Sequence, residues 1–272
     1  MYKVVPTYDN GVWSETEYET IEDFREFIGA IFLEPGKYAF DETSLLFNKE
    51  AKLFNSQGFY CDKPMRSKDF MTYWEDQKNK CRQGVIYKND NKTWYITRDY
   101  YMWLNFLPIF DKEEKHYGFA KIRDAQYHMA LYEIMAEINF KHVAILKKRQ
   151  IASSYFHMAK LLNQYWFEEG SICKIGASLK DYINDKGSWK FLEEYKTFLN
   201  EHTAWYRPSS PEKVLLWEQK IEVRINNRKT YKGLRSKIQG GSFEKNPTTG
   251  VGGPCTFFFH EEAGIAPKMD MT

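Results

Sequence analysis

The chain has 272 residues, of which 43% are hydrophobic and 28% charged, and a formal net charge of +2. This length suits one large domain or a domain with an appended subdomain, and the composition excludes an intrinsically disordered chain. Nine prolines and 16 glycines exclude a fibrous or low-complexity chain. The near-neutral charge does not exclude nucleic acid as a partner, because an acidic face can balance a basic one.

Three further features narrow the class of protein. Aromatic residues make up 17% of the chain. No apolar run approaches the roughly 18 residues that a membrane span needs, and Met1 to Asn10 does not resemble a signal peptide. The four cysteines are widely scattered without a CxxC pair. This pattern favours a reducing cytosol over a disulfide framework or a zinc site.

The first 110 residues predict an aromatic-rich N-terminal region. A short helix is expected over Ile21–Phe32 and a strand over Thr93–Ile96, followed by an apolar stretch over Tyr100–Phe110. Polar turns are expected before the helix, and 37–92 is polar and aromatic with turn signals at Gln57–Gly58 and Asn89–Asn91. The aromatic excess here predicts core packing. We therefore expect a subdomain over 1–110 and a core domain over 111–272.

From Asp124 onward, predicted helices alternate with apolar runs typical of strands. The helical spacing of apolar residues covers Asp124–Asn139, Ser153–Glu169 and Trp189–Leu199. The predicted strands are His142–Leu146, Ser171–Ala177, Val214–Trp217, Ile221–Ile225 and Cys255–Phe259. This alternation predicts an α/β domain with a mostly parallel central sheet flanked by helices.

The junction between the predicted Ala144–Leu146 strand and the next helix reads KKRQIASS. A strand, a tight loop and a helix N-terminus can hold phosphate through backbone N–H groups, a nearby cation and a hydroxyl that reaches Mg²⁺. Against the pattern GxxxxGK[ST], Ala152 replaces the second glycine, Ser153 replaces the lysine, and only Ser154 matches. The alternative reading is a basic surface turn.

A second candidate site is the run FFFHEE, in which an apolar strand ends in Glu261 and Glu262. Ligands bind at the carboxyl edge of open α/β sheets, and adjacent residues of a strand point to opposite sides. One acid could hold Mg²⁺ while the other orients an attacking water. A solvated Glu pair in a turn is the alternative. His260 is expected to be a packing or solvent residue.

A third candidate is Gln126, in the sequence RDAQY that opens a helix. Its amide has both a donor and an acceptor and therefore suits the edge of adenine, although an isolated helical Gln is usually a surface residue.

In this order, RDAQY, KKRQIASS and CTFFFHEEAG resemble the N-terminal ATPase domain of the large terminase subunit of tailed phages. The segment GLRSKIQGGSFEKNPTTGVGG and the upstream YYMWLNFLPI are also similar to that family, and the resemblance covers roughly residues 93–267. It implies a P-loop NTPase fold with atypical Walker A and Walker B motifs. In these atypical loops the phosphate lysine stands at the start, where this chain has Lys147.

The resemblance also implies roles for single residues. Gln126 would contact adenine, Lys147 the phosphates and Arg149 the γ-phosphate. Ser154 and Glu261 would ligate Mg²⁺, and Glu262 would be the catalytic carboxylate. The remaining positions of the nucleotide loop would be Lys148, Gln150, Ala152 and Ser153.

The implied activity is ATP hydrolysis, with ATP and Mg²⁺ as cofactors, that drives packaging of double-stranded DNA. The implied partners are the portal protein and procapsid, the small terminase subunit and further copies in a ring, without a membrane. The expected location is the host cytoplasm and, transiently, the procapsid portal. The chain ends before the family's coupling motif and nuclease domain, so we expect an ATPase core that is incomplete at its C-terminus and hydrolyses poorly.

Alternatives remain open at this point. The chain could be another P-loop ATPase of the helicase type, or a terminase-derived protein that binds DNA or capsid without hydrolysis. Residues 213–237 carry a net charge of +6, which suits a DNA-facing surface or an ordinary solvated strand pair. If the nucleotide reading holds, Ala144–Leu146 and Phe257–Phe259 should be neighbouring parallel strands. Ser154 Oγ should then lie within about 10 Å of the Glu261 carboxylate, close enough to share one metal through a bridging water.

Overall fold

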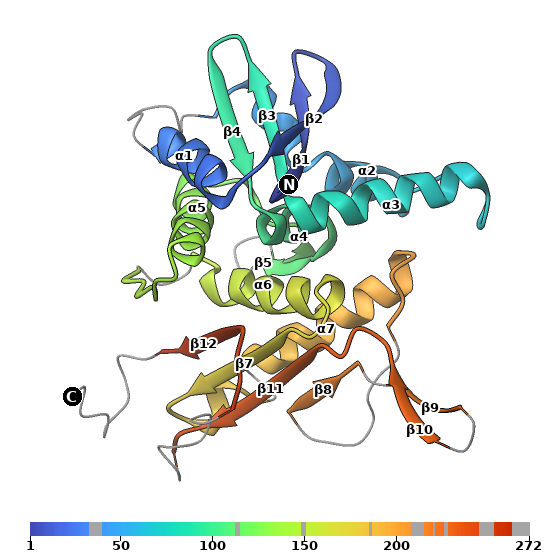
Figure 1. The fold of residues 1–272 in the computed structure, drawn as a ribbon, viewed down its shortest axis with the longest axis vertical. Coiled ribbons are helices and arrows are strands. Elements are labelled where there is room, and N and C mark those ends of the chain that lie inside the picture. Colours follow the sequence, from blue (N-terminus) through green and yellow to red (C-terminus); the bar gives the residue numbers. More distant parts are fainter. Residues whose placement is uncertain are drawn as a thin grey trace. The chain divides into compact units, whose positions relative to one another are not determined.

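The computed structural model describes residues 1–32, 40–111, 115–147, 151–184, 187–207, 215–219, 221–225, 228–244 and 253–262. The chain divides into two compact units, shown in Figure 1 and treated separately below. Unit 1 comprises Met1–Ser153 with His202–Ala204, and unit 2 comprises Ser154–Glu201 with Trp205–Thr272.

The predicted division after residue 110 falls inside unit 1. Helix α5 (Asp124–Ile138) packs against elements of the first hundred residues, and for this reason it belongs to unit 1. Tyr127 of α5 is fully buried, and its hydroxyl accepts a hydrogen bond from the backbone N–H of Tyr95 at 3.2 Å.

Unit 1 is built on a four-stranded mixed sheet in the order β2-β1-β3-β4. Its strands are β1 (Lys3–Asp9), β2 (Val12–Tyr18), β3 (Val85–Asn89) and β4 (Lys92–Ile96). The β1–β3 pair is parallel and the other two pairs are antiparallel. The β1–β2 hairpin corrects the expectation of polar turns. Its turn residues Asn10 and Gly11 have φ values of 44° and 96°, as two-residue hairpin turns require.

Helices surround this sheet and supply most of the aromatic core. They are α1 (Ile21–Phe32), η1 (Glu42–Leu46), α2 (Lys49–Gln57), α3 (Lys68–Gln83), α4 (Arg98–Phe106) and α5. A short hairpin, β5 (Ile109–Asp111) and β6 (His116–Gly118), follows α4. Helix α4 is buried from Asp99 to Phe106, so the predicted apolar stretch is mostly a core helix. The predicted helix over Ile21–Phe32 is confirmed.

Unit 2 contains a second mixed sheet in the order β12-β7-β11-β8. The strands are β7 (Ile172–Ala177), β8 (Leu216–Glu218), β11 (Lys237–Ser242) and β12 (Phe257–Glu261). Strand β7 is parallel to both β11 and β12, whereas β8 is antiparallel to β11. The fold is therefore mixed α/β, with an antiparallel strand at one end of this sheet.

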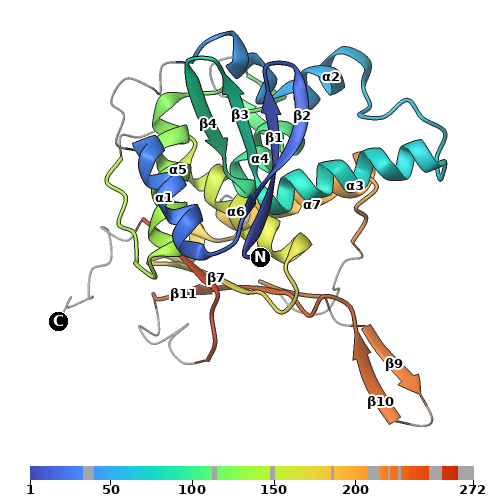
Figure 2. The same ribbon diagram turned by 45° about the horizontal axis from the view of Figure 1, so that its top comes forward.

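Two helices, α6 (Ser153–Phe167) and α7 (Ser188–His202), lie on the same side of this sheet (Figures 1 and 2). Side chains of both contact Trp217 of β8: the Tyr165 ring from α6 and the Trp189 ring from α7. Between β7 and α7 lies the short helix η2 (Lys180–Tyr182). A separate hairpin is formed by β9 (Ile221–Ile225) and β10 (Arg228–Lys232).

The predicted strand over His142–Leu146 is wrong. Residues 141–147 contain no strand, and Leu146 is fully exposed. The predicted pairing of Ala144–Leu146 with Phe257–Phe259 is wrong as well, because β12 pairs with β7. An apolar run of five residues becomes a strand only where another strand satisfies its backbone hydrogen bonds. In the described residues, no strand pairs with this run.

In the part of the chain that the structure describes, no helix is long and apolar enough to cross a membrane.

One buried amide fixes helix α2 to helix α4 and provides a test of the packing of unit 1. The Asn105 Oδ1 atom accepts a hydrogen bond from Glu50 N at 3.1 Å, and Nδ2 donates to Phe47 O at 2.8 Å. We predict that Asn105→Ala lowers the free energy of unfolding by about 3 kcal/mol, because it leaves buried backbone groups unpaired and opens a cavity. The measurement is the urea midpoint at constant m value.

The matched control is Asn55→Ala, which removes an exposed amide from α2. It should change stability by no more than about 0.5 kcal/mol. Equal midpoints for the two variants would contradict the role assigned to Asn105.

Candidate functional site

Two residues that are 107 positions apart in sequence meet in unit 2. The Ser154 hydroxyl, in the first turn of α6, donates to Glu261 Oε1 at a distance of 2.6 Å. Glu261 ends β12, and its side chain is 7% exposed. The predicted proximity of these two residues is therefore met, although the strand expected before the loop is absent.

A second hydroxyl completes the hydrogen bonding of this carboxylate. Ser188, the first residue of α7, donates to Glu261 Oε2 at 2.7 Å and is itself buried. In the described chain, Glu261 has no cationic partner. The sequence analysis gave Ser188 no role. Serine is common at the start of a helix because it caps the helix, so Ser188 needed no other explanation. No pattern in the sequence predicts its contact with a residue 73 positions away.

The position of Glu261 at the sheet edge follows from the alternation of side chains along β12. Phe257, Phe259 and Glu261 face α6: Lys160 lies over the Phe257 ring, and His157 stacks on Phe259 at 4.3 Å. In the register of β12 with β7, Glu261 lies opposite Ala177. The following residue, Ser178, has a buried Oγ that lacks a hydrogen-bond partner within the described residues.

His260 points to the other face of β12, where its ring lies 5.0 Å from that of Phe243. Burial lowers the pKa of His260. This environment agrees with the packing role that the sequence analysis expected.

Glu262 follows the strand with an exposed side chain and a backbone φ of 50°. Few residues other than glycine adopt this left-handed conformation, which costs roughly 1–2 kcal/mol. Residues held in such conformations cluster at functional sites.

The other predicted site residues lie in unit 1. Gln126 is 4% exposed, and its Nε2 donates to the carbonyl of Ile151 at 3.1 Å. Its Oε1 is buried and has no hydrogen-bond partner among the residues described. Gln126 thus holds the end of the loop that precedes α6, and its second amide atom is a buried acceptor without a partner among the described residues.

Within that loop, Ala152 has a φ of 55°, so the backbone adopts the conformation that a glycine would supply. Ser153 is buried, and its Oγ lies 3.8 Å from Met129 Sδ. Lys147 is exposed. The predicted positions Lys148, Arg149 and Gln150 lie outside the described residues.

Ser154 and Glu261 offer two neighbouring oxygens that could serve as metal ligands. Mg²⁺ takes oxygen ligands at 2.0–2.1 Å in octahedral geometry, which places neighbouring oxygens roughly 2.9 Å apart. The oxygens of Ser154 and Glu261 are already close to this separation. The described residues contain no cluster of three or more His, Cys, Asp or Glu that could hold a metal. A metal at this pair would take most of its ligands from outside the protein, as Mg²⁺ commonly does.

No protein-family model matches the chain, and a search of curated proteins finds no relative.

The left-handed backbone of Ala152 predicts that replacement of this alanine by glycine stabilises the protein, whereas the same replacement at Ala125 destabilises it. Ala152→Gly should raise the free energy of unfolding by about 0.5–1 kcal/mol, because relief of the left-handed strain exceeds the added unfolded-state entropy. The control, Ala125→Gly in the first turn of α5, should lower it by up to about 1 kcal/mol. Thermal or urea unfolding measures both, and a loss of stability with Ala152→Gly would refute the strain assignment.

The Glu261 carboxylate gives a second prediction. Ser188→Ala should destabilise the protein by about 2 kcal/mol, because a buried carboxylate oxygen loses its donor. Ser56→Ala, at an exposed serine of α2, is the control and should change stability by less than about 0.5 kcal/mol. Both are measured by urea unfolding, and equal effects would show that the Ser188–Glu261 hydrogen bond contributes little.

Proposed function

We propose that this chain is an ATP-binding and ATP-hydrolysing motor subunit of the large-terminase type, which drives packaging of phage double-stranded DNA. The observation that carries the proposal is the 2.6 Å hydrogen bond between Ser154 and Glu261. It joins a hydroxyl at a helix N-terminus to an acid at the end of a parallel strand, as a P-loop NTPase site requires. Under this proposal the fold of unit 2 is a P-loop NTPase core, and the protein works in the host cytoplasm and at the procapsid portal.

Ser154 and Glu261 would hold Mg²⁺, which supplies charge neutralisation at the phosphate oxygens of ATP when it is bound. Ser188 donates a hydrogen bond to Oε2 and so would fix the carboxylate, leaving Oε1 as the oxygen that would hold the metal. This arrangement supports a metal role for Glu261 rather than a role as base.

Glu262 would serve the attacking water. In hydrolysis a water oxygen bonds to the γ-phosphorus while the bond from phosphorus to the β-phosphate oxygen breaks, and the water must lose a proton. The exposed carboxylate of Glu262, next in sequence to the metal acid, can orient that water and accept a hydrogen bond from it.

The loop before α6 would bind the phosphates. The positive end of the helix dipole at the start of α6 favours an anion there. Lys147 would contribute the cation, and Arg149 would approach the γ-phosphate. Gln126 would accept a hydrogen bond from the exocyclic amine of adenine through its unpaired Oε1, which is buried and would have to become accessible when the nucleotide binds.

A second candidate function is a terminase-derived protein that binds DNA or capsid without hydrolysis. The coil at 141–147 favours it, because the loop then lacks the strand that would hold it rigidly. An equilibrium titration of the 272-residue chain with ATP, with and without Mg²⁺, separates the two. Mg²⁺-dependent binding supports the ATPase, and absence of binding supports the second candidate.

We predict different effects for the two acids. Glu262→Gln should bind ATP normally and turn over roughly 10²-fold more slowly, the scale of one lost general-base contribution. Glu261→Gln should weaken Mg²⁺-dependent binding itself. The measurements are an ATP titration and phosphate release under single-turnover conditions.

The control variant is Glu169→Gln, which changes an exposed acid just after α6 and should leave both quantities unchanged. Unimpaired turnover by Glu262→Gln would show that Glu262 is not the catalytic carboxylate.

A further inference from the structure

Strand β2 forms one edge of the unit 1 sheet, and in the described chain its outer side pairs with no other strand. It pairs with β1 over its whole length, Val12–Tyr18, in one unbroken register. Pro6 of β1 has no N–H, so the Pro6–Glu15 pair is one of the pairs without hydrogen bonds in the alternating antiparallel pattern. The alternation extends to the neighbouring pairs of the same kind. It follows that the outward-pointing backbone N–H and C=O groups are those of Trp13, Glu15 and Glu17.

These outward backbone groups lie on an exposed strand. The residues from Val12 to Glu15 are all exposed, and so is Glu17. Among the described residues, no other element supplies a hydrogen bond to the outward groups of β2. A free edge of this kind can template an extended chain, which adds to the sheet as a further strand. Seven residues of β2 offer about 23 Å for such pairing.

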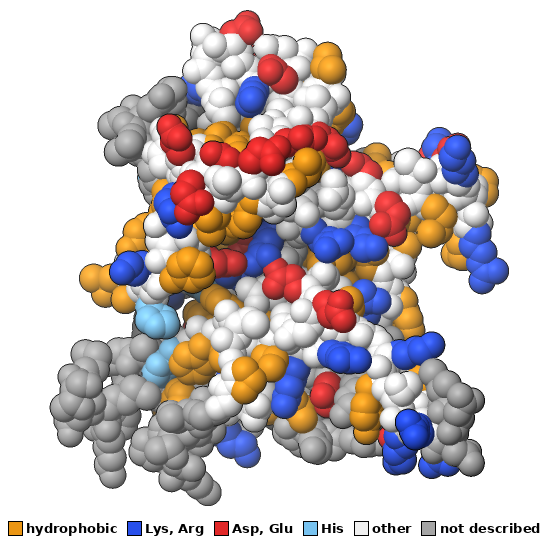
Figure 3. Space-filling view, in the orientation of Figure 1, with side chains coloured by type: hydrophobic (Ala, Val, Ile, Leu, Met, Phe, Trp, Pro, Cys, Tyr) orange, Lys and Arg blue, Asp and Glu red, His pale blue; other side chains and the backbone are white. Residues whose placement is uncertain are grey.

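The side chains that follow this edge make it acidic. Residues 15–26 contain six acidic side chains, all of them exposed, and one basic side chain, Arg25. The acidic residues are Glu15, Glu17, Glu19, Glu22, Asp23 and Glu26. Figure 3 shows a band of red side chains across unit 1, in the region where Figure 1 draws β2 and α1. A positively charged partner therefore suits this edge, although the whole chain has a net charge of +2.

Two of these acids belong to β2 itself and have no cationic partner in the described chain. The residues directly across from Glu15 and Glu17 in β1 are Pro6 and Val4, which carry no charge. A strand that paired with the outer side of β2 would place its own side chains directly opposite these carboxylates. Because opposite charges stabilise such cross-strand pairs, Lys or Arg is favoured at every second position of the incoming strand.

Trp13 lies on the same face of β2 as Glu15 and Glu17, since side chains alternate along a strand. Its side chain is 48% exposed. The Lys80 Nζ atom lies 4.1 Å from the centre of the Trp13 ring, and Asp76 holds that ammonium group at 2.7 Å. The ring is therefore supported by the protein while half of its surface stays open to a side chain of the incoming strand.

A second copy of this chain is a poor occupant of the edge. Antiparallel pairing of the whole of β2 with its own copy would centre on Glu15 and place the two Glu15 side chains directly opposite each other. Like charges in that position destabilise a strand pair, and edge charges are a common protection against self-pairing. The edge therefore fits a basic segment of a different protein.

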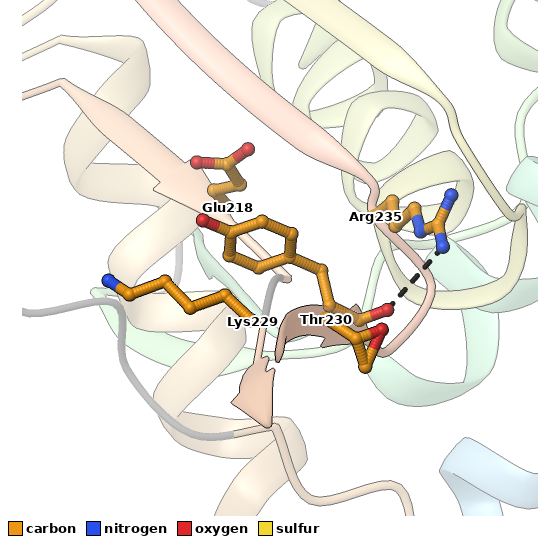
Figure 4. A pocket seen from close by; sticks show the side chains of 5 residues that line it. Glu218, Lys229, Thr230 and Arg235 are labelled. Atoms are coloured by element: carbon orange, nitrogen blue, oxygen red, sulfur yellow. Dashed lines mark hydrogen bonds between the residues drawn. The ribbon is translucent and has the colours of Figure 1, made fainter. Parts of the chain in front are cut away.

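A hollow in unit 2 has a different charge pattern. Its volume is about 460 Å³, and its wall includes Glu218, Lys229 and Arg235 (Figure 4). Because one carboxylate and two cations lie together there, the hollow does not favour a ligand of one charge. The charges of β2 are all of one sign, which makes its edge the more selective surface.

We propose that the β2 edge binds an extended basic segment of a partner protein, which adds to the unit 1 sheet antiparallel to β2. The outward backbone groups supply hydrogen bonds that any strand could use. Glu15 and Glu17 select Lys or Arg at alternate positions of that strand. In antiparallel pairing the residue opposite Glu15 both exchanges hydrogen bonds with it and lies on the same face. This contact lies within unit 1 and does not depend on the nucleotide site proposed for unit 2.

The first test measures peptide binding by the full 272-residue chain without nucleotide. A fluorescent peptide of sequence KTKVKTK is titrated and followed by anisotropy. Its binding should weaken as NaCl screens the charges. The double variant Glu15→Gln, Glu17→Gln should bind about tenfold more weakly at 0.1 M salt, because two cross-strand pairs of opposite charge are lost.

The matched control removes the same charge from exposed acids of unit 2, in the double variant Glu169→Gln, Glu193→Gln. Its affinity for the peptide should equal that of the unchanged chain. Circular dichroism establishes that both double variants are folded. Equal losses in the two variants would reduce the effect to net charge and overturn the proposal.

The second test separates strand pairing from charge attraction. N-methylation of the peptide at its lysines keeps every charge but removes the N–H groups that face β2 in antiparallel pairing. It should weaken binding at least about tenfold, because several backbone hydrogen bonds are lost. N-methylation at the threonines and the valine removes N–H groups that point away from β2 and should leave the affinity unchanged. Equal affinities of the two methylated peptides would overturn the proposed pairing.

Amide hydrogen exchange locates the contact on the protein. In the free chain the N–H groups of Trp13, Glu15 and Glu17 should exchange faster than those of Ser14 and Thr16, which face β1. Saturating peptide should slow exchange at the first three by at least about tenfold and leave the other two nearly unchanged. Absence of this alternation would overturn the proposal. So would a dimer of the free chain, detected by sedimentation velocity, in which the same three amides are already protected.

Discussion

A buried carboxylate must be hydrogen-bonded, and unit 2 is arranged around that requirement at Glu261. Both donors come from first turns of helices, Ser154 of α6 and Ser188 of α7. An unpaired buried carboxylate would cost several kcal/mol, so these hydroxyls fix both helices to the end of β12. The same constraint brings together the two oxygens to which the proposed function assigns Mg²⁺. Stability and the proposed chemistry therefore depend on one side chain.

Backbone strain accompanies this arrangement at two places in the sequence. Ala152 precedes α6 and Glu262 follows β12, and both have left-handed φ values although neither is glycine. Each costs roughly 1–2 kcal/mol, which the surrounding contacts must offset. Beside Ala152, the hydrogen bond from Gln126 to the carbonyl of Ile151 holds the backbone within unit 1. Beside Glu262, the hydrogen bond from Ser154 holds the carboxylate of the preceding residue, Glu261. Strain of this kind positions a loop or a side chain at the expense of stability.

The sequence predicted the elements with strong periodicity and missed those that depend on partners. The helix over Ile21–Phe32 and the cores of α5, α6 and α7 follow from apolar spacing alone. The meeting of Ser154 with Glu261 was predicted from a family resemblance, because no local pattern connects them. The prediction of a strand over 142–146 was wrong, because a short apolar segment does not reveal whether a neighbouring strand exists. The burial of Gln126 and the hydrogen bond from Ser188 to Glu261 depend on the tertiary fold, so no local sequence pattern could have predicted them.

Helix α6 connects the proposed metal site at Ser154 to the base of the β9–β10 hairpin at Tyr165, and the distances involved show whether a change at one end can move the other. Ser154 and Tyr165 are eleven positions apart, or about 16 Å along the helix. Opening the Ser154–Glu261 pair from 2.6 Å to the roughly 2.9 Å of a shared Mg²⁺ requires a movement of only a few tenths of an ångström. Rotation of two side chains supplies that much, while Phe156 to Phe167 stay packed. Under the proposed function, metal binding alone would therefore leave the base of the hairpin in place. Helix α6 would then be a rigid support for the proposed nucleotide site, and any movement driven by hydrolysis would come from elements other than this helix.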